Sequence, residues 1–274
     1  MPGSSLRARP HPERRIVNEP QSRQPIVNAP GIVLVMLGLL AAVHGVRQLL
    51  DPALDDQVLV ALALIPARSQ LLGLPPMGGG LPGGELAVWT QFISHMLLHA
   101  DLAHLLINGA WLLVFGSIVA RRLGTVRFLV FFVATGIAAG LAFFLVHRSE
   151  LQPMVGASGA VSGLMAGALI LLFSAADVGS GSLVTRYARL VPRLPLGRLL
   201  VDRRMIAATL ALVGLNLLLA TGFGAFLSGG GGIAWEAHLG GYFAGLLAFG
   251  LIDDGPTRRD PPVTDDEADD APQA

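Results

Sequence analysis

The predicted fold depends on two stretches, Val155-Gly156-Ala157-Ser158-Gly159-Ala160 and Glu236-Ala237-His238-Leu239-Gly240-Gly241. Each stretch lies at the start of an apolar run that is long enough to form a membrane helix. A serine and a histidine at the ends of two such runs are the side chains that nucleophilic catalysis inside a membrane requires. Because a polar side chain is costly in lipid, we interpret Ser158 and His238 as functional residues.

The composition is that of a membrane protein. Hydrophobic residues make up 53% of the 274 residues and charged residues only 14%, whereas about 25% of a soluble domain is charged. Six segments are apolar enough to cross a bilayer, where a helix needs about 20 such residues. They lie near residues 31–50, 102–120, 126–147, 156–173, 205–226 and 234–252. The sequence therefore predicts an all-α membrane protein, a bundle of six transmembrane helices.

The arginines indicate the orientation of the bundle. Lysine is absent, and the arginines concentrate in the N-terminal tail and in the loops after the second and fourth segments. Cytoplasmic loops are the basic ones, so we expect both termini in the cytoplasm. A basic face for nucleic acid would not alternate with apolar segments, and we expect no nucleic-acid partner.

Three regions follow from the composition along the chain. Residues 1–28 are rich in proline and arginine and residues 253–274 are acidic, so both are predicted to be disordered cytoplasmic tails. Residues 29–252 form the membrane domain. Within it, residues 51–90 are predicted to form a loop with short helices on the outer face of the membrane.

Small residues predict how the fourth and sixth segments pack. Gly159, Gly163 and Gly167 repeat every four residues along the fourth segment, and Gly241 and Gly245 do so along the sixth. Glycines at this spacing let two membrane helices approach closely. Close packing here would bring the serine hydroxyl within reach of the imidazole.

The second segment carries a third group of polar residues at the same predicted depth. His104 and Asn108 are spaced i and i+4, so they share a helix face, and their N–H groups could bind a developing oxyanion. The alternative is a metal site, since histidines at helical spacing are favoured ligands. Because Asp101 is the only carboxylate nearby and HExxH is absent, we expect no metal and no other cofactor. For His95 and His99 we expect structural roles.

These motifs resemble those of the rhomboid family of intramembrane serine proteases. The match consists of His95-x3-His99-x4-His104-x3-Asn108, Gly156-Ala157-Ser158-Gly159 and Ala237-His238-x2-Gly241-x3-Gly245. The order, the spacing and the placement on the second, fourth and sixth helices all follow the family pattern. The resemblance covers roughly residues 30–252.

The resemblance implies a six-helix rhomboid-like bundle with a water-filled cavity open to the outer side. Ser158 would be the nucleophile and His238 the general base of a dyad. The Ser158 backbone N–H and the side chains of His104 and Asn108 would stabilise the oxyanion. Substrates would be single-span membrane proteins, cut in or near the outer end of their helix. We expect a multi-pass protein of a bacterial plasma membrane.

The sequence departs from the family pattern at Ser162, four residues after the serine, where an aromatic residue is frequent. It also lacks a Trp-Arg pair in residues 51–90. Two other functions compete with a protease: a catalytically inactive rhomboid-like protein that binds membrane clients, and a small-molecule transporter. The presence of both Ser158 and His238 argues against the first, and the lack of an inverted repeat argues against the second.

Overall fold

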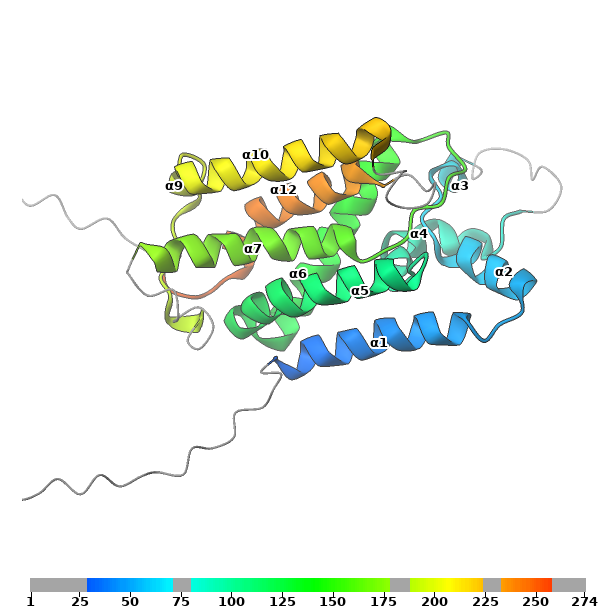
Figure 1. Cartoon of the computed structure of the whole chain (residues 1–274), viewed down its shortest axis with the longest axis horizontal. Coiled ribbons are helices and arrows are strands. Elements are labelled where there is room, and N and C mark those ends of the chain that lie inside the picture. The colour runs from blue at the N-terminus through cyan, green and yellow to red at the C-terminus, as the bar shows by residue number, and fades with distance from the viewer. Residues whose placement is uncertain (1–28, 71–79, 178–187, 224–232, 258–274) are drawn as a thin grey trace, which may run out of the picture.

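The structure, a computed structural model, describes residues 29–70, 80–177, 188–223 and 233–257 (Figure 1). In these ranges the regular secondary structure is helical, apart from two isolated β-bridges. The elements are α1 (Gly31–Arg47), α2 (Pro52–Leu62), α3 (Pro66–Gln70), α4 (Gly84–Ser94), η2 (His95–Leu97), α5 (Leu102–Trp111), the π-helical turn η3 (Leu112–Gly116), α6 (Ser117–Val146), α7 (Ser158–Ala176), η4 (Ala188–Leu190), α9 (Leu196–Leu199), α10 (Arg203–Leu218), the π-helical turn η5 (Leu219–Phe223) and α12 (Trp235–Ile252). The predicted tail at 1–28 and residues 258–274 of the other tail lie outside the described residues.

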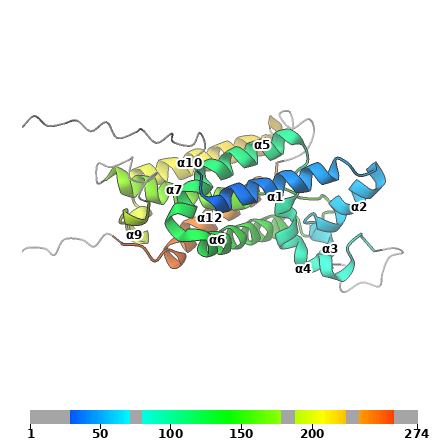
Figure 2. The ribbon, with the colours of Figure 1, turned by 90° about the horizontal axis from the view of Figure 1, so that it is seen from below.

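The long helices lie side by side, with α2, α3 and α4 at one end of the bundle and α9 at the other (Figure 1). Seen from below, α1 lies on the near side of the bundle and α10 on the far side (Figure 2). Helix α12 packs against both α6 and α7, and these three helices form the centre. The short helices at the first end agree with the helices predicted within residues 51–90, of which 71–79 lie outside the described residues. Their placement on the outer face of the membrane stays a prediction.

Three helical stretches are long and apolar enough to cross a membrane, namely Leu102–Val146, Ser158–Ala176 and Arg203–Thr221. The first contains two of the predicted segments, because the backbone at Gly124 is not helical (φ 73°, ψ 174°) and divides it. Its last residue is Val146, one residue before the predicted end. Helices α1 and α12 have 17 and 18 residues, and the count of six crossings stays a prediction.

Burial distinguishes the central helices from the peripheral ones. In α7, 72% of the apolar window is buried inside the protein, whereas in the stretch from Arg203 to Thr221 only 11% is buried. Leucines 210, 215 and 218 on α10 are half or more exposed. An apolar surface of this extent suits lipid rather than water. The bundle thus has a packed centre and a lipid-facing helix at its edge.

Glycines let α7 and α12 pack with their backbones in contact. A Cβ on Gly241 would overlap the carbonyl oxygen of Gly159, and a Cβ on Gly245 would lie 2.5 Å from the carbonyl oxygen of Gly163. No larger residue fits at either position without moving one helix. The predicted close packing of the fourth and sixth segments is confirmed.

Arginines fix the end of the bundle that carries α2 to α4. The buried Arg68 side chain donates hydrogen bonds to the carbonyl groups of Val60 and Pro82. Arg47, at the end of α1, forms a two-pronged ion pair with Asp55 at 2.7 and 2.9 Å. These contacts join α1 to α2, and α3 to α2 and to Pro82.

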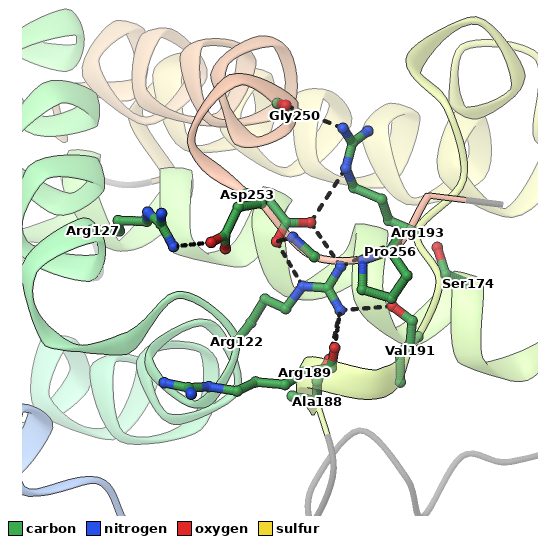
Figure 3. Close-up of polar contacts among 12 residues, drawn as sticks. Arg122, Arg127, Ser174, Ala188, Arg189, Val191, Arg193, Gly250, Asp253 and Pro256 are labelled. Atoms are coloured by element: carbon green, nitrogen blue, oxygen red, sulfur yellow. Dashed lines mark hydrogen bonds and ion pairs between the residues drawn. The ribbon is translucent and has the colours of Figure 1, made fainter.

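A buried ion pair joins distant parts of the chain at the opposite end (Figure 3). Arg122 of α6 donates from Nε and Nη2 to the two carboxylate oxygens of Asp253 at 2.7 and 2.8 Å. Its Nη1 donates to the carbonyl groups of Ala188 and Val191 at 2.8 and 2.7 Å. The folded domain therefore extends past Ile252, where the sequence analysis places the start of the acidic tail.

Asp253 also contacts the segment between η4 and α9. Arg193 Nε lies 3.2 Å from Asp253 Oδ2, and Arg193 Nη2 donates to the carbonyl of Gly250 at 3.1 Å (Figure 3). Both oxygens of the Asp253 carboxylate thus have an arginine partner, as a buried charge requires.

We predict that Asp253→Ala destabilises the protein by roughly 3–5 kcal/mol, because it leaves the buried Arg122 charge unpaired. The measurement is thermal unfolding in detergent. The matched control is Asp254→Ala, which removes an exposed ion pair with Arg127 at 2.5 Å and should leave the unfolding temperature nearly unchanged. Equal effects of the two variants would contradict a special role for the buried pair.

Candidate active site

The backbone before Ser158 is hydrogen-bonded to the backbone of two other segments. Met154 pairs with Leu64 through two backbone hydrogen bonds of 3.0 and 2.8 Å, and the Gly156 N–H donates to the carbonyl of His95 at 2.9 Å. Gly156 has φ of 123°, a conformation that a side chain disfavours. This turn delivers Ser158 as the first residue of α7.

The structure brings Ser158 and His238 together. His238 lies in the first turn of α12, and its Nε2 is 2.9 Å from Ser158 Oγ. This is hydrogen-bonding distance between a potential nucleophile and a potential base. The two residues are 80 positions apart in the chain and come from the two helices that the glycines bring into contact.

Asn216 of α10 contacts the other side of the imidazole. Its Oδ1 lies 2.9 Å from His238 Nδ1, and its side chain is 2% exposed. The sequence analysis missed this residue. The available signal was an amide inside an otherwise apolar segment, which is a candidate functional position by its cost in lipid.

His104 lies beside the serine, whereas Asn108 has a partner in its own helix. A Cβ on Gly156 would be 2.7 Å from His104 Nε2 and 3.7 Å from Ser158 Oγ, so the His104 ring lies against the turn that precedes the serine. Asn108 is buried and donates from Nδ2 to the carbonyl of His104 at 3.1 Å. The first-turn N–H groups of α7, including that of Ser158, lack acceptors within the helix.

His95 and His99 have structural contacts. His95 is buried with Nδ1 2.8 Å from the carbonyl of Gln91. His99 packs edge-on against His104, with ring centroids 5.1 Å apart, and its carbonyl accepts a hydrogen bond of 2.9 Å from Arg47. The His95 contact agrees with the structural role expected from the sequence, whereas both ring nitrogens of His99 are buried without a hydrogen-bond partner among the described residues.

A family model of the rhomboid domain matches residues 86–252 of this chain. The chain belongs to the rhomboid family. The matched region begins in α4 and ends with the last residue of α12, so it contains Ser158, His238, Asn216, His104 and Asn108.

Individual rhomboid relatives are similar over parts of the chain. One relative is YdcA of Bacillus subtilis, whose name refers to the rhomboid proteases. It is 34% identical over 103 residues, which are 36% of this chain and 50% of that protein. Rhomboid-like protein 11, chloroplastic, of Arabidopsis thaliana is 29% identical over 170 residues, 62% of this chain and 54% of that protein. The rhomboid protease GlpG of Haemophilus influenzae is 36% identical over 53 residues, 19% of this chain and 27% of that protein. The chain thus spans about half the length of the first two relatives.

No three histidine or acidic side chains in the described part of this rhomboid come together as metal ligands. His104, His99 and His95 each have the contacts given above, with the turn at Gly156, with His104 and with Gln91. The expectation of a site without a metal stays a prediction.

Ser162 does not replace the frequent aromatic residue as a support for the imidazole. Its hydroxyl donates to the carbonyl of Ser158, one turn earlier in α7, at 2.9 Å. That bond satisfies the hydroxyl inside its own helix. In this rhomboid the side-chain hydrogen bonds of His238 therefore come from Ser158 and Asn216.

Glu236 points away from the dyad, as its position two residues before His238 predicts. Its Oε1 lies 2.9 Å from Nε2 of His147, which directly follows the Leu102–Val146 span. His147 Nδ1 lies 3.0 Å from Glu150 Oε2. Burial alone would lower the pKa of His147, but the two carboxylates outweigh it and raise that pKa above its usual value.

This raised pKa predicts a pH-dependent stability. Protonated His147 stabilises the folded state, and the contribution is complete below the unfolded pKa of about 6.5 and is lost as pH rises through the higher folded pKa. The wild type should therefore lose thermal stability as pH rises above about 6.5 and through the raised pKa of His147. His147→Gln should flatten this dependence in unfolding experiments in detergent. An unchanged pH dependence in the variant would assign the effect to other groups.

Proposed function

We propose that this rhomboid is an intramembrane serine protease that hydrolyses peptide bonds in or near the transmembrane segments of membrane proteins. The observation that carries the proposal is the 2.9 Å contact between Ser158 Oγ and His238 Nε2, at the start of two tightly packed helices. The proposal is further supported by the names of its relatives, among them a rhomboid protease.

The dyad would act in two half-reactions. His238 Nε2 accepts the proton of the Ser158 hydroxyl while Oγ attacks the peptide carbonyl carbon. The carbon–nitrogen bond then breaks as His238 returns that proton to the leaving amine, which leaves an acyl group on Ser158. A water molecule, deprotonated by His238, attacks this ester. The bond between the acyl carbon and Oγ then breaks, the acid product leaves, and His238 returns the proton to Ser158 Oγ.

Oxyanion stabilisation would come from three sources. The Ser158 N–H lies at the N-terminus of α7, where unpaired N–H groups and the helix dipole favour negative charge. The His104 ring lies against the turn at Gly156. Asn108 uses one amide N–H on the His104 carbonyl, and its second N–H is available as a donor.

The substrate class follows from the surroundings of the dyad. A site between membrane helices meets polypeptide that is itself in the membrane, and single-span proteins can reach it laterally. We propose that the cut falls near the outer end of the substrate helix, with both termini of the enzyme in the cytoplasm of a bacterial cell. A substrate helix must unwind locally, since its carbonyl groups are otherwise hydrogen-bonded.

We predict that Ser158→Ala and His238→Ala each abolish cleavage without unfolding the protein. Nucleophile and base act as a unit, so the double variant should lose little more than either single one. The assay is co-expression with a panel of tagged single-span proteins, followed by detection of the shortened products.

Ser162→Ala is the matched control for that experiment. It removes a hydroxyl one turn away on the same helix face, and cleavage should persist. Cleavage by Ser158→Ala would contradict the dyad. A wild type that binds panel members without cutting any of them would favour the client-binding alternative.

We also predict that His104→Ala and Asn108→Ala each lower kcat by about 10²–10³, the usual effect of losing one oxyanion donor. KM should change little, because the oxyanion forms only as the serine attacks. The measurements are kcat, KM and the unfolding temperature of each variant. A loss of activity that is matched by a collapse of the unfolding temperature would make these residues structural.

A further inference from the structure

We infer that Asn216 is a positioning residue for His238, so that the site works as a Ser-His-Asn arrangement. The inference rests on the proposed function and names a third member of that site. It is carried by the hydrogen bond of 2.9 Å between Asn216 Oδ1 and His238 Nδ1, on the side of the imidazole opposite to Ser158.

The orientation of the Asn216 amide decides which of its atoms meets the imidazole. Its Nδ2 donates to the carbonyl of Leu212, one turn earlier in α10, at 2.9 Å. A flipped amide would place two oxygens against each other at Leu212, so Oδ1 is the atom that faces His238. Because Oδ1 can only accept, His238 Nδ1 carries the proton.

This proton placement is the one that catalysis requires. In a neutral imidazole with the proton on Nδ1, the lone pair is on Nε2, which lies 2.9 Å from Ser158 Oγ. Asn216 therefore selects the tautomer in which His238 can accept the serine proton. It also fixes the rotation of the ring, as the third residue does in other nucleophile–base–orienter sites.

No aromatic support competes with Asn216 for this role in the described region. Ser162, at the position where the family often has an aromatic residue, is hydrogen-bonded to the carbonyl of Ser158. Asn216 and Met205 are the two buried residues of α10, whose other residues are half-buried or exposed. Burial of an amide on so exposed a helix indicates a specific use for it.

The alternative is that Asn216 only holds α10 against α12. Another contact between the same two helices provides a matched control for this alternative. Thr209 of α10 shares a hydrogen bond of 2.9 Å with the hydroxyl of Tyr242 of α12. If Asn216 served only to hold α10 on α12, loss of the Thr209 contact would have a comparable effect. If Asn216 orients His238, only its own loss lowers turnover.

The experiment compares wild type, Asn216→Leu, Asn216→Asp and Thr209→Val in the full chain in detergent. The measurements are kcat and KM on a single-span reporter that the wild type cleaves, the labelling rate with a fluorophosphonate probe, and the unfolding temperature. Asn216→Leu keeps the branched shape of the side chain, at a larger volume, and removes both the acceptor for His238 and the donor to Leu212. Its kcat and labelling rate should fall roughly 10- to 100-fold, the scale of a misplaced catalytic group, with KM unchanged.

Asn216→Asp loses the amide donor to Leu212 but keeps an acceptor for the Nδ1–H of His238. Because the acceptor orients the imidazole, this variant should retain most of the turnover. Thr209→Val should match wild type in kcat. Full activity in Asn216→Leu, or an equal fall in Thr209→Val, overturns the inference. Should Asn216→Leu fail to fold, a folded but inactive Asn216→Asp overturns it and an active one supports it. A wild type that neither cleaves nor reacts with the probe overturns the proposed function, and this inference with it.

Discussion

The backbone contact between α7 and α12 is the constraint on which the rest of the site depends. Gly241 and Gly245 lie so close to the carbonyl groups of Gly159 and Gly163 that no side chain fits between the helices. Ser158 and His238 are at the same end of these two helices, so the contact sets the distance between their reactive atoms. Without a hydrophobic driving force between helices in lipid, such packing is what holds membrane helices together.

Contacts at both ends of the bundle fix the elements around Ser158 and His238. At one end, the pairing of Met154 with Leu64 and the bond from the Gly156 N–H fix the turn before Ser158. At the other end, the buried pair of Arg122 and Asp253 joins α6 to the segment that follows α12. Such polar groups are costly in an apolar protein, and each has its partners. The peripheral helix α10 adds two polar contacts to this centre, from Asn216 to His238 and from Thr209 to Tyr242.

Much of the site could be predicted from the sequence because its signals were local. Glycine spacing predicted the helix contact, and Ser158 and His238 stand out as polar residues at the ends of apolar runs. Asn216 was missed because its role depends on where α10 lies relative to His238, which no spacing along the chain reveals. The extension of the folded domain to Asp253 was missed because an acidic, proline-containing segment resembles a disordered tail unless its buried arginine partner is known.

The most direct test of the account is to map the adduct that a fluorophosphonate forms on the purified protein, by mass spectrometry of its peptides. The account predicts that Ser158 is the modified residue, because its hydroxyl lies 2.9 Å from the imidazole Nε2 of His238, which can act as its base. It also predicts that His238→Ala prevents the modification. Modification of another serine, or of Ser158 at an unchanged rate without His238, would contradict the dyad.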